Sequence, residues 1–167
     1  MQVKNVHERK IPASATLVGA LIDTLASNGD QLWPRHKWPP MKFEKDLKVG
    51  AKGGHGPIRY SIRSYEPGKR ICFQFASPKG FNGYHSFWVE QSGEGVVLRH
   101  VLEMKTSGLA LLSWPLIFRP LHDALIEDSL DKAETNMGGN PSGSSWTWWV
   151  KALRWLLSKQ AANRRSS

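Results

Sequence analysis

A strict alternation of apolar and polar residues in the middle of the chain constrains the fold most strongly. Because successive residues of a β-strand point to opposite faces of its sheet, this pattern predicts two strands that share one buried face. A Pro-Gly turn at 66–69 suits a tight hairpin, and pairing residue 66 with residue 69 fixes the register. A shift by one residue would turn every apolar side chain to solvent. The alternating apolar residues are Ile58, Tyr60 and Ile62 before the turn and Ile71, Phe73 and Phe75 after it, with Ile62 opposite Phe73 and Tyr60 opposite Phe75.

A second predicted hairpin carries two histidines on the face that should be buried. The loop at 92–95 joins its strands, and pairing residue 91 with residue 96 sets Phe87 opposite His100. The same register sets His85 opposite Leu102. An imidazole on an inner face has lost solvation by water, so it needs a polar partner there. His85 and His100 therefore mark polar points inside the domain.

A helix that follows the strands adds a third histidine. At 100° per residue, the apolar residues between Trp114 or Pro115 and Met137 fall on one arc, and His122 lies near the centre of that arc. We expect this arc to face the sheet. Four carboxylates fall on the adjacent arc, which we expect to face water or a basic partner: Asp123, Glu127, Asp131 and Glu134.

The flanking segments complete an α+β domain. Pro12 and Ser14 open a first helix, which Asn28-Gly29-Asp30 ends. Prolines in the segment after it forbid a regular helix and predict an ordered loop or one broken turn. Trp33, Trp38 and Phe81 lie in loops, where they either form a lid or cap the core. The other predicted segments are a strand over Val3–Ile11, a possible strand over Lys42–Val49, and a flexible stretch over Gly50–Pro57 that forms a mobile cavity mouth or a bulged strand.

Composition limits the class of protein. The 167 residues suffice for one domain with a real core, and a single cysteine, Cys72, excludes an internal disulfide framework. Neither a signal peptide nor an apolar run long enough to cross a bilayer is visible, so we expect a soluble, cytoplasmic protein without a cofactor. The net charge is +9, but no nucleic-acid-binding motif accompanies it. We therefore predict no nucleic-acid partner.

The C-terminal segment combines tryptophans with basic residues. We expect a domain over 1–137, a Gly/Ser-rich linker over 138–145, and a Trp-rich amphipathic helix with a basic tail over 146–167. Two interpretations remain open for this helix. Either its apolar face packs on this domain or on a second subunit, with its cations near the acidic arc, or residues 146–160 make peripheral membrane contact.

Several short motifs accompany this order of elements. With a strand, a helix, a broken segment, a curved meander and a long helix, residues 1 to about 137 resemble the helix-grip fold of the START-like, Bet v 1-like superfamily. The chain is most similar to bacterial SRPBCC proteins of the polyketide cyclase/dehydratase-like type. The resemblance implies a curved antiparallel sheet wrapped around the long helix, with a mostly apolar cavity between them. The motifs are Leu32-Trp33-Pro34, Trp38-Pro39-Pro40-Met41, Gly53-Gly54-His55-Gly56-Pro57, Tyr65-Glu66-Pro67-Gly68, Gly83-Tyr84-His85, Trp114-Pro115-Leu116 and Leu121-His122-Asp123-Ala124-Leu125.

These observations favour binding of a small, largely apolar molecule, lipid-like or polyketide-like, in an internal cavity. One alternative is a cyclase- or dehydratase-type enzyme with His85, His100 or His122 as general acid or base. Another is a membrane-associated lipid carrier, and the histidines could also be satisfied core residues. No Asp or Glu lies on an inward strand face to orient a histidine, so we predict no metal. The predicted lining residues are Tyr60, Ile62, Phe73, Phe75, His85, Phe87, His100, Leu102, His122 and Ile126.

Overall fold

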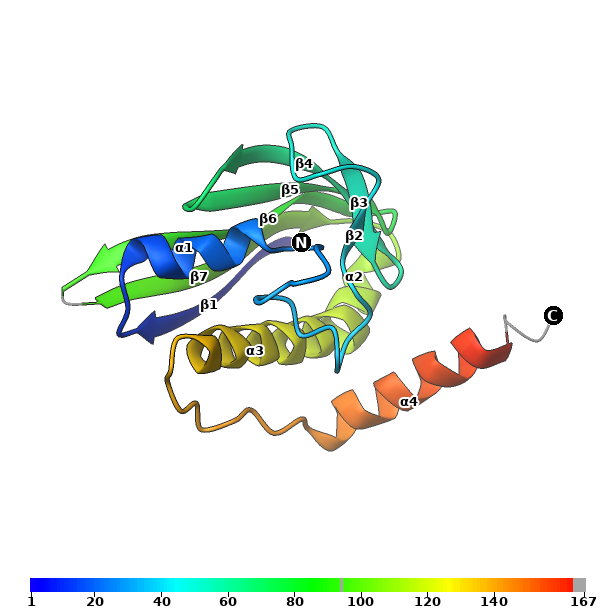
Figure 1. Ribbon diagram of the computed structural model, residues 1–167. Coiled ribbons are helices and arrows are strands. Elements are labelled where there is room, and N and C mark those ends of the chain that lie inside the picture. The colour runs from blue at the N-terminus through cyan, green and yellow to red at the C-terminus, as the bar shows by residue number, and fades with distance from the viewer. Residues whose placement is uncertain (94, 164–167) are drawn as a thin grey trace.

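A seven-stranded antiparallel sheet curves around one long helix (Figure 1). The computed structural model describes residues 1–93 and 95–163, so Glu94 and the expected basic tail, with Arg164 and Arg165, lie outside the described residues. The spatial order of the strands is β1-β7-β6-β5-β4-β3-β2. Their bounds are β1 (Gln2–Ile11), β2 (Lys42–Phe43), β3 (Lys52–His55), β4 (Ile58–Glu66), β5 (Arg70–Ser77), β6 (Phe81–Ser92) and β7 (Gly95–Thr106).

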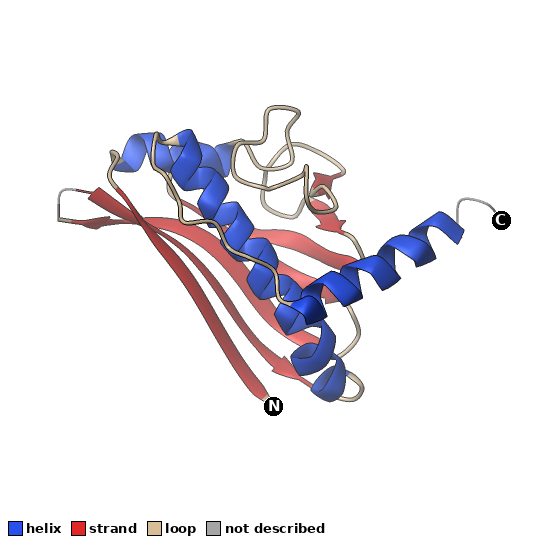
Figure 2. Ribbon diagram, turned by 90° about the horizontal axis from the view of Figure 1, so that it is seen from below, coloured by secondary structure: helices blue, strands red, loops and turns tan. Residues whose placement is uncertain are grey.

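The helices cover one face of this sheet, and the longest crosses it obliquely (Figure 2). The predicted long helix begins earlier than expected and changes geometry along its length. Pro115 and Pro120 carry no amide hydrogen, so two bonds of the α-helical ladder cannot form, and a π-helical turn occupies this stretch. The helical elements are α1 (Ala15–Asp23), α2 (Ala110–Ser113), the π-helix η1 (Trp114–Phe118), α3 (Arg119–Asn136) and α4 (Trp148–Asn163).

The predicted hairpin registers are confirmed where side chains are buried. His85 pairs with Leu102 and Phe87 with His100. In the first hairpin the predicted inner-face pairs are also present, but the predicted pairing of residues 66 and 69 at the turn was wrong by one residue. Glu66 pairs with position 70, and a shift between Ile62 and Ser64 absorbs the difference. A β-bulge of this kind leaves one residue unpaired and keeps the apolar face inward.

Of the two interpretations of Gly50–Pro57, a strand is the one observed, since Lys52–His55 form β3. Gly53 and Gly54 allow this, because the neighbouring backbone comes too close for a side chain. A Cβ atom at Gly53 would lie 2.3 Å from the Lys42 carbonyl oxygen, and one at Gly54 would lie 2.1 Å from that of Ile58. The preceding strand, β2, ends at Phe43 and does not continue to Val49 as predicted.

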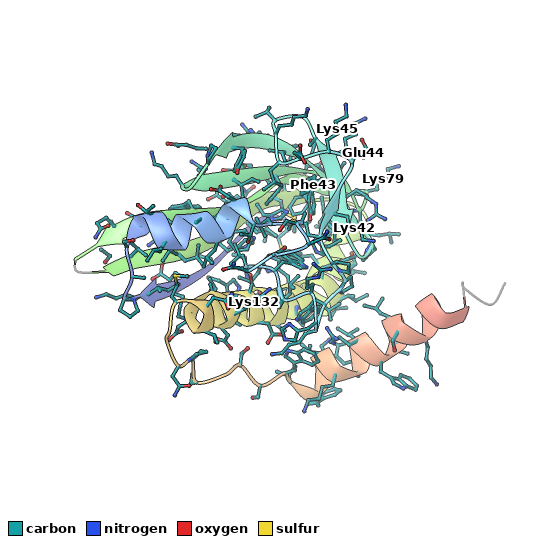
Figure 3. The ribbon with its side chains drawn as sticks, in the orientation of Figure 1. Lys42, Phe43, Glu44, Lys45, Lys79 and Lys132 are labelled. Atoms are coloured by element: carbon teal, nitrogen blue, oxygen red, sulfur yellow. The ribbon has the colours of Figure 1, made fainter. Side chains whose placement is uncertain are left out.

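The first helix is also shorter than predicted. Ser14 caps its start by accepting a hydrogen bond from the Leu17 amide, but the helix ends at Asp23. Ala26 then takes a φ of 62°, a left-handed conformation that a helix cannot contain. Lys132 on α3 secures the loop beyond it, since its Nζ donates to the carbonyl oxygens of Asp30 and Trp33 at 2.7 and 2.8 Å (Figure 3).

The acidic arc of α3 faces a basic partner, as one of the two predictions allowed, and that partner is β1. Arg9 bridges Glu134 at 2.5 Å, Asp131 at 2.8 Å and Glu127 at 3.2 Å. The expectation that the cations of the last helix would meet this arc was wrong. Arg154 on α4 lies over tryptophan rings instead.

The start of α4 packs on the domain, and much of the rest of the helix is exposed. Val150 and Leu153 are buried, and the indole Nε1 of Trp149 donates to the Leu116 carbonyl at 2.8 Å. The Arg154 guanidinium lies 4.2 Å from the ring centre of Trp38 and 4.1 Å from that of Trp146, which is cation–π geometry. Among the residues that the structure describes, no helix is long and apolar enough to cross a membrane.

Candidate functional site

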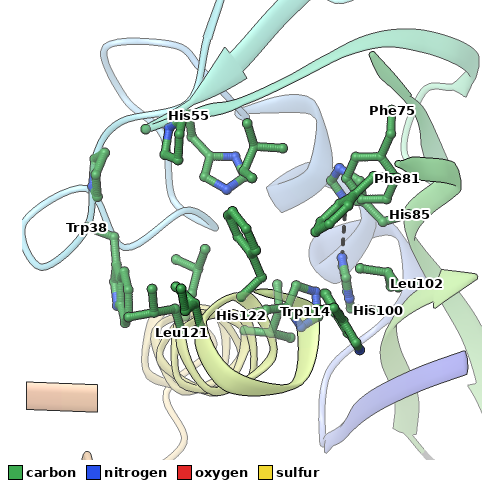
Figure 4. A pocket seen from close by; sticks show the side chains of 18 of the residues that line it. Trp38, His55, Phe75, Phe81, His85, His100, Leu102, Trp114, Leu121 and His122 are labelled. Carbon is green, nitrogen blue, oxygen red and sulfur yellow. Dashed lines mark hydrogen bonds between the residues drawn. The ribbon is translucent and has the colours of Figure 1, made fainter. Parts of the chain in front are cut away.

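A mostly apolar cavity of about 420 Å³ lies between the concave face of the sheet and α3 (Figure 4). Of the predicted lining residues, four are fully buried in the core and do not reach it: Tyr60, Ile62, Phe73 and Phe87. Six line it: Phe75, His85, His100, Leu102, His122 and Ile126.

Several other lining residues come from segments outside the predicted strand alternation. Trp33, Trp38 and Phe81 are buried and also line the cavity. The expectation that Phe81 lies in a loop was wrong, since it begins β6. Trp114 reaches the cavity from the π-helical turn, where the chain departs from 100° per residue. Leu157 on α4 also lines the cavity, so the C-terminal helix contributes to the site.

His85 and His100 form a hydrogen-bonded pair on the sheet wall. Nδ1 of His85 lies 3.2 Å from Nε2 of His100, so one ring donates and the other accepts. Burial strongly lowers the pKa of both imidazoles, and neighbouring histidines lower it further. Both rings are therefore neutral at neutral pH, each with one donor and one acceptor nitrogen.

The α3 helix brings His122 to the same region. Its ring centre lies 5.1 Å from that of His100. Three buried nitrogens here have no hydrogen-bond partner among the described residues: Nε2 of His85, Nδ1 of His100 and Nε2 of His122. Each unpaired buried polar atom lowers the stability of the folded protein by about 1–3 kcal/mol. A ligand that hydrogen-bonds to these nitrogens would remove that penalty.

Carboxylates do orient a histidine here, contrary to the expectation from the strands. Asp123 Oδ1 lies 3.4 Å from Nδ1 of His122 and 3.2 Å from Nε2 of His7. The other ring nitrogen of His7, Nδ1, lies 2.6 Å from Glu127 Oε1. The strand prediction missed this because these carboxylates come from a helix. The alternation of Val3, Asn5, His7, Arg9 and Ile11 could have revealed the polar inner face of β1.

This network shifts the pKa values of its members in opposite directions. Burial disfavours the charged form of His7, but hydrogen bonds with Asp123 and Glu127 outweigh it and raise the His7 pKa. Burial also opposes ionisation of Asp123, yet hydrogen bonds from His122 and His7 hold the Asp123 pKa well below its usual range. An imidazolium between two carboxylates donates from both ring nitrogens.

A fourth histidine occupies the opposite wall. Burial lowers the pKa of His55 to about 3, and the charges of His122 and Arg59 act in the same direction. Its Nδ1 lies 3.1 Å from the Tyr60 hydroxyl. His55 escaped prediction because the glycines around it give the segment no apolar alternation.

One group among the described residues could hold a metal ion: His7, His122 and Asp123 offer ligand atoms within 4.8 Å of one another. Asp123 Oδ1 of this group already contacts Nδ1 of His122 and Nε2 of His7, whereas Nε2 of His122 has no partner among the described residues. The three histidines weighed from the sequence, His85, His100 and His122, do not form such a group.

Asp128 holds three segments together beside the cavity wall, and no pattern in the sequence points to it. Its carboxylate is fully buried and accepts from Trp38 Nε1 at 2.7 Å and Trp146 Nε1 at 2.9 Å. Lys37 Nζ lies 2.7 Å from its other oxygen. Asp128 thus ties the proline-rich loop, α3 and the entry to α4 together.

Neither a family model nor a curated protein matches the chain. Solved structures do match it over most of its length. Norcoclaurine synthase from Thalictrum is 17% identical, with 83% of this chain and 98% of that chain covered and a TM-score of 0.61. CalU16 from Micromonospora echinospora is 14% identical, with 96% and 86% covered and a TM-score of 0.57. Ara h 8.0201 is 11% identical, with 84% and 100% covered and a TM-score of 0.58. The chain therefore has the helix-grip fold of Bet v 1-like proteins.

Proposed function

We propose that the protein binds a small, largely apolar molecule that carries a carbonyl or hydroxyl group. The observation that supports this most directly is the set of unpartnered nitrogens of His85, His100 and His122 in an apolar cavity. A carbonyl oxygen can accept from a neutral imidazole, and a hydroxyl can also donate to one. A volume of about 420 Å³ is in the range of pockets for small ligands.

In this proposal residues 1–137 form the binding domain, 138–145 the linker and 146–167 an appended segment. Leu157 of that segment lines the cavity. Norcoclaurine synthase has the same fold and was solved in complex with a transition-state analogue. That neighbour supports the general idea of a small ligand held by this fold. We also propose a reducing, cytoplasmic setting, since the single thiol, Cys72, is free and buried.

The test compares two probes of the same shape, 2-acetylnaphthalene and 2-ethylnaphthalene, by calorimetric titration. We expect the ketone to bind about tenfold more tightly, since one hydrogen bond to a buried polar group contributes about 1–2 kcal/mol. The His85→Leu variant should show a smaller preference for the ketone, since it removes one of the three unpartnered nitrogens. His36→Leu, at an exposed position, is the matched control and should keep the preference. Equal affinity of the two probes for the unaltered protein would reject the proposal.

A specific observation also favours the second candidate, an enzyme that moves protons. The contacts His122–Asp123–His7–Glu127 lead from the cavity to a carboxylate whose side chain is 35% exposed. Such a path could pass a proton between the cavity and water.

Exchange of the α-protons of 2-tetralone for deuterium, followed by NMR, tests proton transfer without knowledge of the substrate. An enzyme of this kind should accelerate exchange, and His122→Gln should remove the acceleration. His36→Leu should retain it. Exchange no faster than in buffer would rule out this candidate and leave the binding proposal standing.

A further inference from the structure

The exposed large apolar side chains are concentrated on one part of the protein. Ten of the fourteen found among the described residues lie on the segment 109–117 or on α4. Exposed apolar residues scattered singly are normal, but a concentration of this kind marks an interaction site. We call this set the entrance surface: Leu109, Leu111, Leu112, Leu116, Ile117, Trp148, Trp149, Trp155, Leu156 and Leu157.

The two parts of the entrance surface meet at the mouth of the cavity. The hydrogen bond from Trp149 to the Leu116 carbonyl joins them. Ile117 from η1 and Leu157 from α4 both line the cavity. Figure 2 shows α4 extending away from the rest of the molecule, so its outer part has no neighbour in the described chain. A molecule that enters or leaves by this mouth passes between apolar side chains.

The charge around the entrance surface has one sign. No acidic residue occurs between Lys105 and His122 or within α4. Lys151 and Lys159 on α4 are exposed, and Lys159 Nζ lies 3.9 Å from the ring centre of Trp155. Exposed tryptophans beside lysines are typical of helices that lie in the interface of an anionic membrane.

We propose that the entrance surface docks on an anionic phospholipid membrane, with the cavity mouth facing the bilayer. The helix α4 would lie in the interface, since it is not apolar enough to cross. Its lysines would meet lipid phosphates, while its tryptophans and the leucines of 109–117 enter the region below the headgroups. The docking proposal rests on the proposed function only for the molecule that is exchanged: an apolar ligand would pass between the bilayer and the cavity without crossing water.

A second copy of the chain is the competing occupant of this surface. Two entrance surfaces placed face to face would bring lysines against lysines, and like charges across an interface are unfavourable. Charge complementarity therefore favours anionic lipid over self-association.

The test is flotation of the full chain with vesicles of phosphatidylcholine alone or mixed with phosphatidylglycerol. We expect binding to the mixed vesicles, loss of that binding at high salt, and at least tenfold weaker binding by Trp148→Ala/Trp155→Ala. Leu17→Ala, at an exposed position of α1, is the matched apolar control and should bind normally. Binding by the double variant equal to that of the unaltered protein would overturn the proposal, and so would no binding at all.

A charge variant tests the lipid chemistry separately. Lys151→Gln/Lys159→Gln should weaken binding to the mixed vesicles about tenfold or more. Lys10→Gln/Lys69→Gln, which removes two exposed lysines on β1 and in the turn between β4 and β5, should not. Equal effects of the two pairs would mean that net charge alone drives binding, against a defined docking surface.

Two further measurements separate this proposal from its neighbours. Sedimentation velocity of the unaltered protein and of Trp148→Ala/Trp155→Ala detects self-association. A dimer that this variant dissolves, without vesicle binding, would assign the surface to a second copy and reject the membrane. Titration with 2-acetylnaphthalene reports on the cavity: retained probe binding without vesicle binding sinks only the docking proposal, and the reverse result sinks only the proposed ligand.

Discussion

Trp38 and Asp128 are joined by a hydrogen bond of 2.7 Å, although ninety positions separate them in the chain. Trp38 lines the cavity, and Asp128 lies on the side of α3 that faces the proline-rich loop. The bond therefore fixes one wall of the cavity to the helix that forms another.

We predict that Asp128→Ala destabilises the protein by about 3–5 kcal/mol, because it leaves two indole donors and the Lys37 ammonium without their buried partner. Urea denaturation measures the change. Asp46→Ala removes an exposed carboxylate and should change the free energy of unfolding by less than about 0.5 kcal/mol. A similar small effect at Asp128 would show that this wall of the cavity does not depend on the Asp128 carboxylate.

Stability should fall as the solution is acidified below the ordinary histidine pKa. His55, His85 and His100 have pKa values lowered by burial, to about 3 for His55. Below about pH 6.5 the unfolded chain binds protons at these positions and the folded chain does not. Each of the three then removes about 1.4 kcal/mol per pH unit from the free energy of unfolding.

Urea denaturation at a series of pH values checks this slope. His85→Gln should make the slope shallower, and His36→Gln should leave it unchanged. A slope that is the same in all three proteins would contradict the assignment of His85 as a buried neutral group.

His7 should behave in the opposite way. Its pKa is raised in the folded protein, so the stability that it contributes is fully present below the unfolded pKa. That contribution should disappear as the pH rises through the pKa of His7 in the folded state. We expect the difference in stability between the unaltered protein and His7→Gln to shrink at alkaline pH. An NMR titration of the His7 ring provides the folded pKa directly, and a value below 6.5 would disprove the prediction.

The close approach of β2 to β3 should make Gly53 intolerant of a side chain. Gly53→Ala puts a methyl group 2.3 Å from the Lys42 carbonyl oxygen, so one strand must move. We expect a loss of about 1–3 kcal/mol in thermal or urea unfolding. Gly29→Ala is the control, because its added methyl would meet nothing closer than 4.0 Å. Equal stability of the two variants would mean that β2 can move away from the added methyl group without loss of folding free energy.

Some of the site could be predicted from the sequence, and the reason differs from residue to residue. His85 and His100 were placed correctly because alternation on two long strands fixes the face of every residue. Helical phasing likewise turned His122 inward. His55 could not be placed, since Gly53 and Gly54 have no side chains to phase.

The carboxylate network lay beyond this kind of reasoning. A helical period tells which residues share an arc but not what faces that arc. Asp123 meets Asn5 across 118 positions, and only the folded sheet brings β1 to it. The proline-induced turn at 114–118 likewise shifts the start of the helix, which is why Trp114 and its role in the cavity wall were missed.

The position of β1 has a consequence for how this protein is made. During synthesis β1 precedes β7, its only strand neighbour in the described sheet, by about ninety residues. Arg9 is separated from its ion-pair partner Glu134 by a still longer stretch of chain. Until β7 has left the ribosome, β1 lacks its hydrogen-bonding partner, and until α3 has followed, the inner face of β1 lacks its acidic counterpart. Pairing between such distant segments is intrinsically slow. Completion of the sheet therefore depends on the return of the earliest strand, and a chain stalled before residue 95 would leave β1 with no partner strand and expose its edge to neighbouring chains.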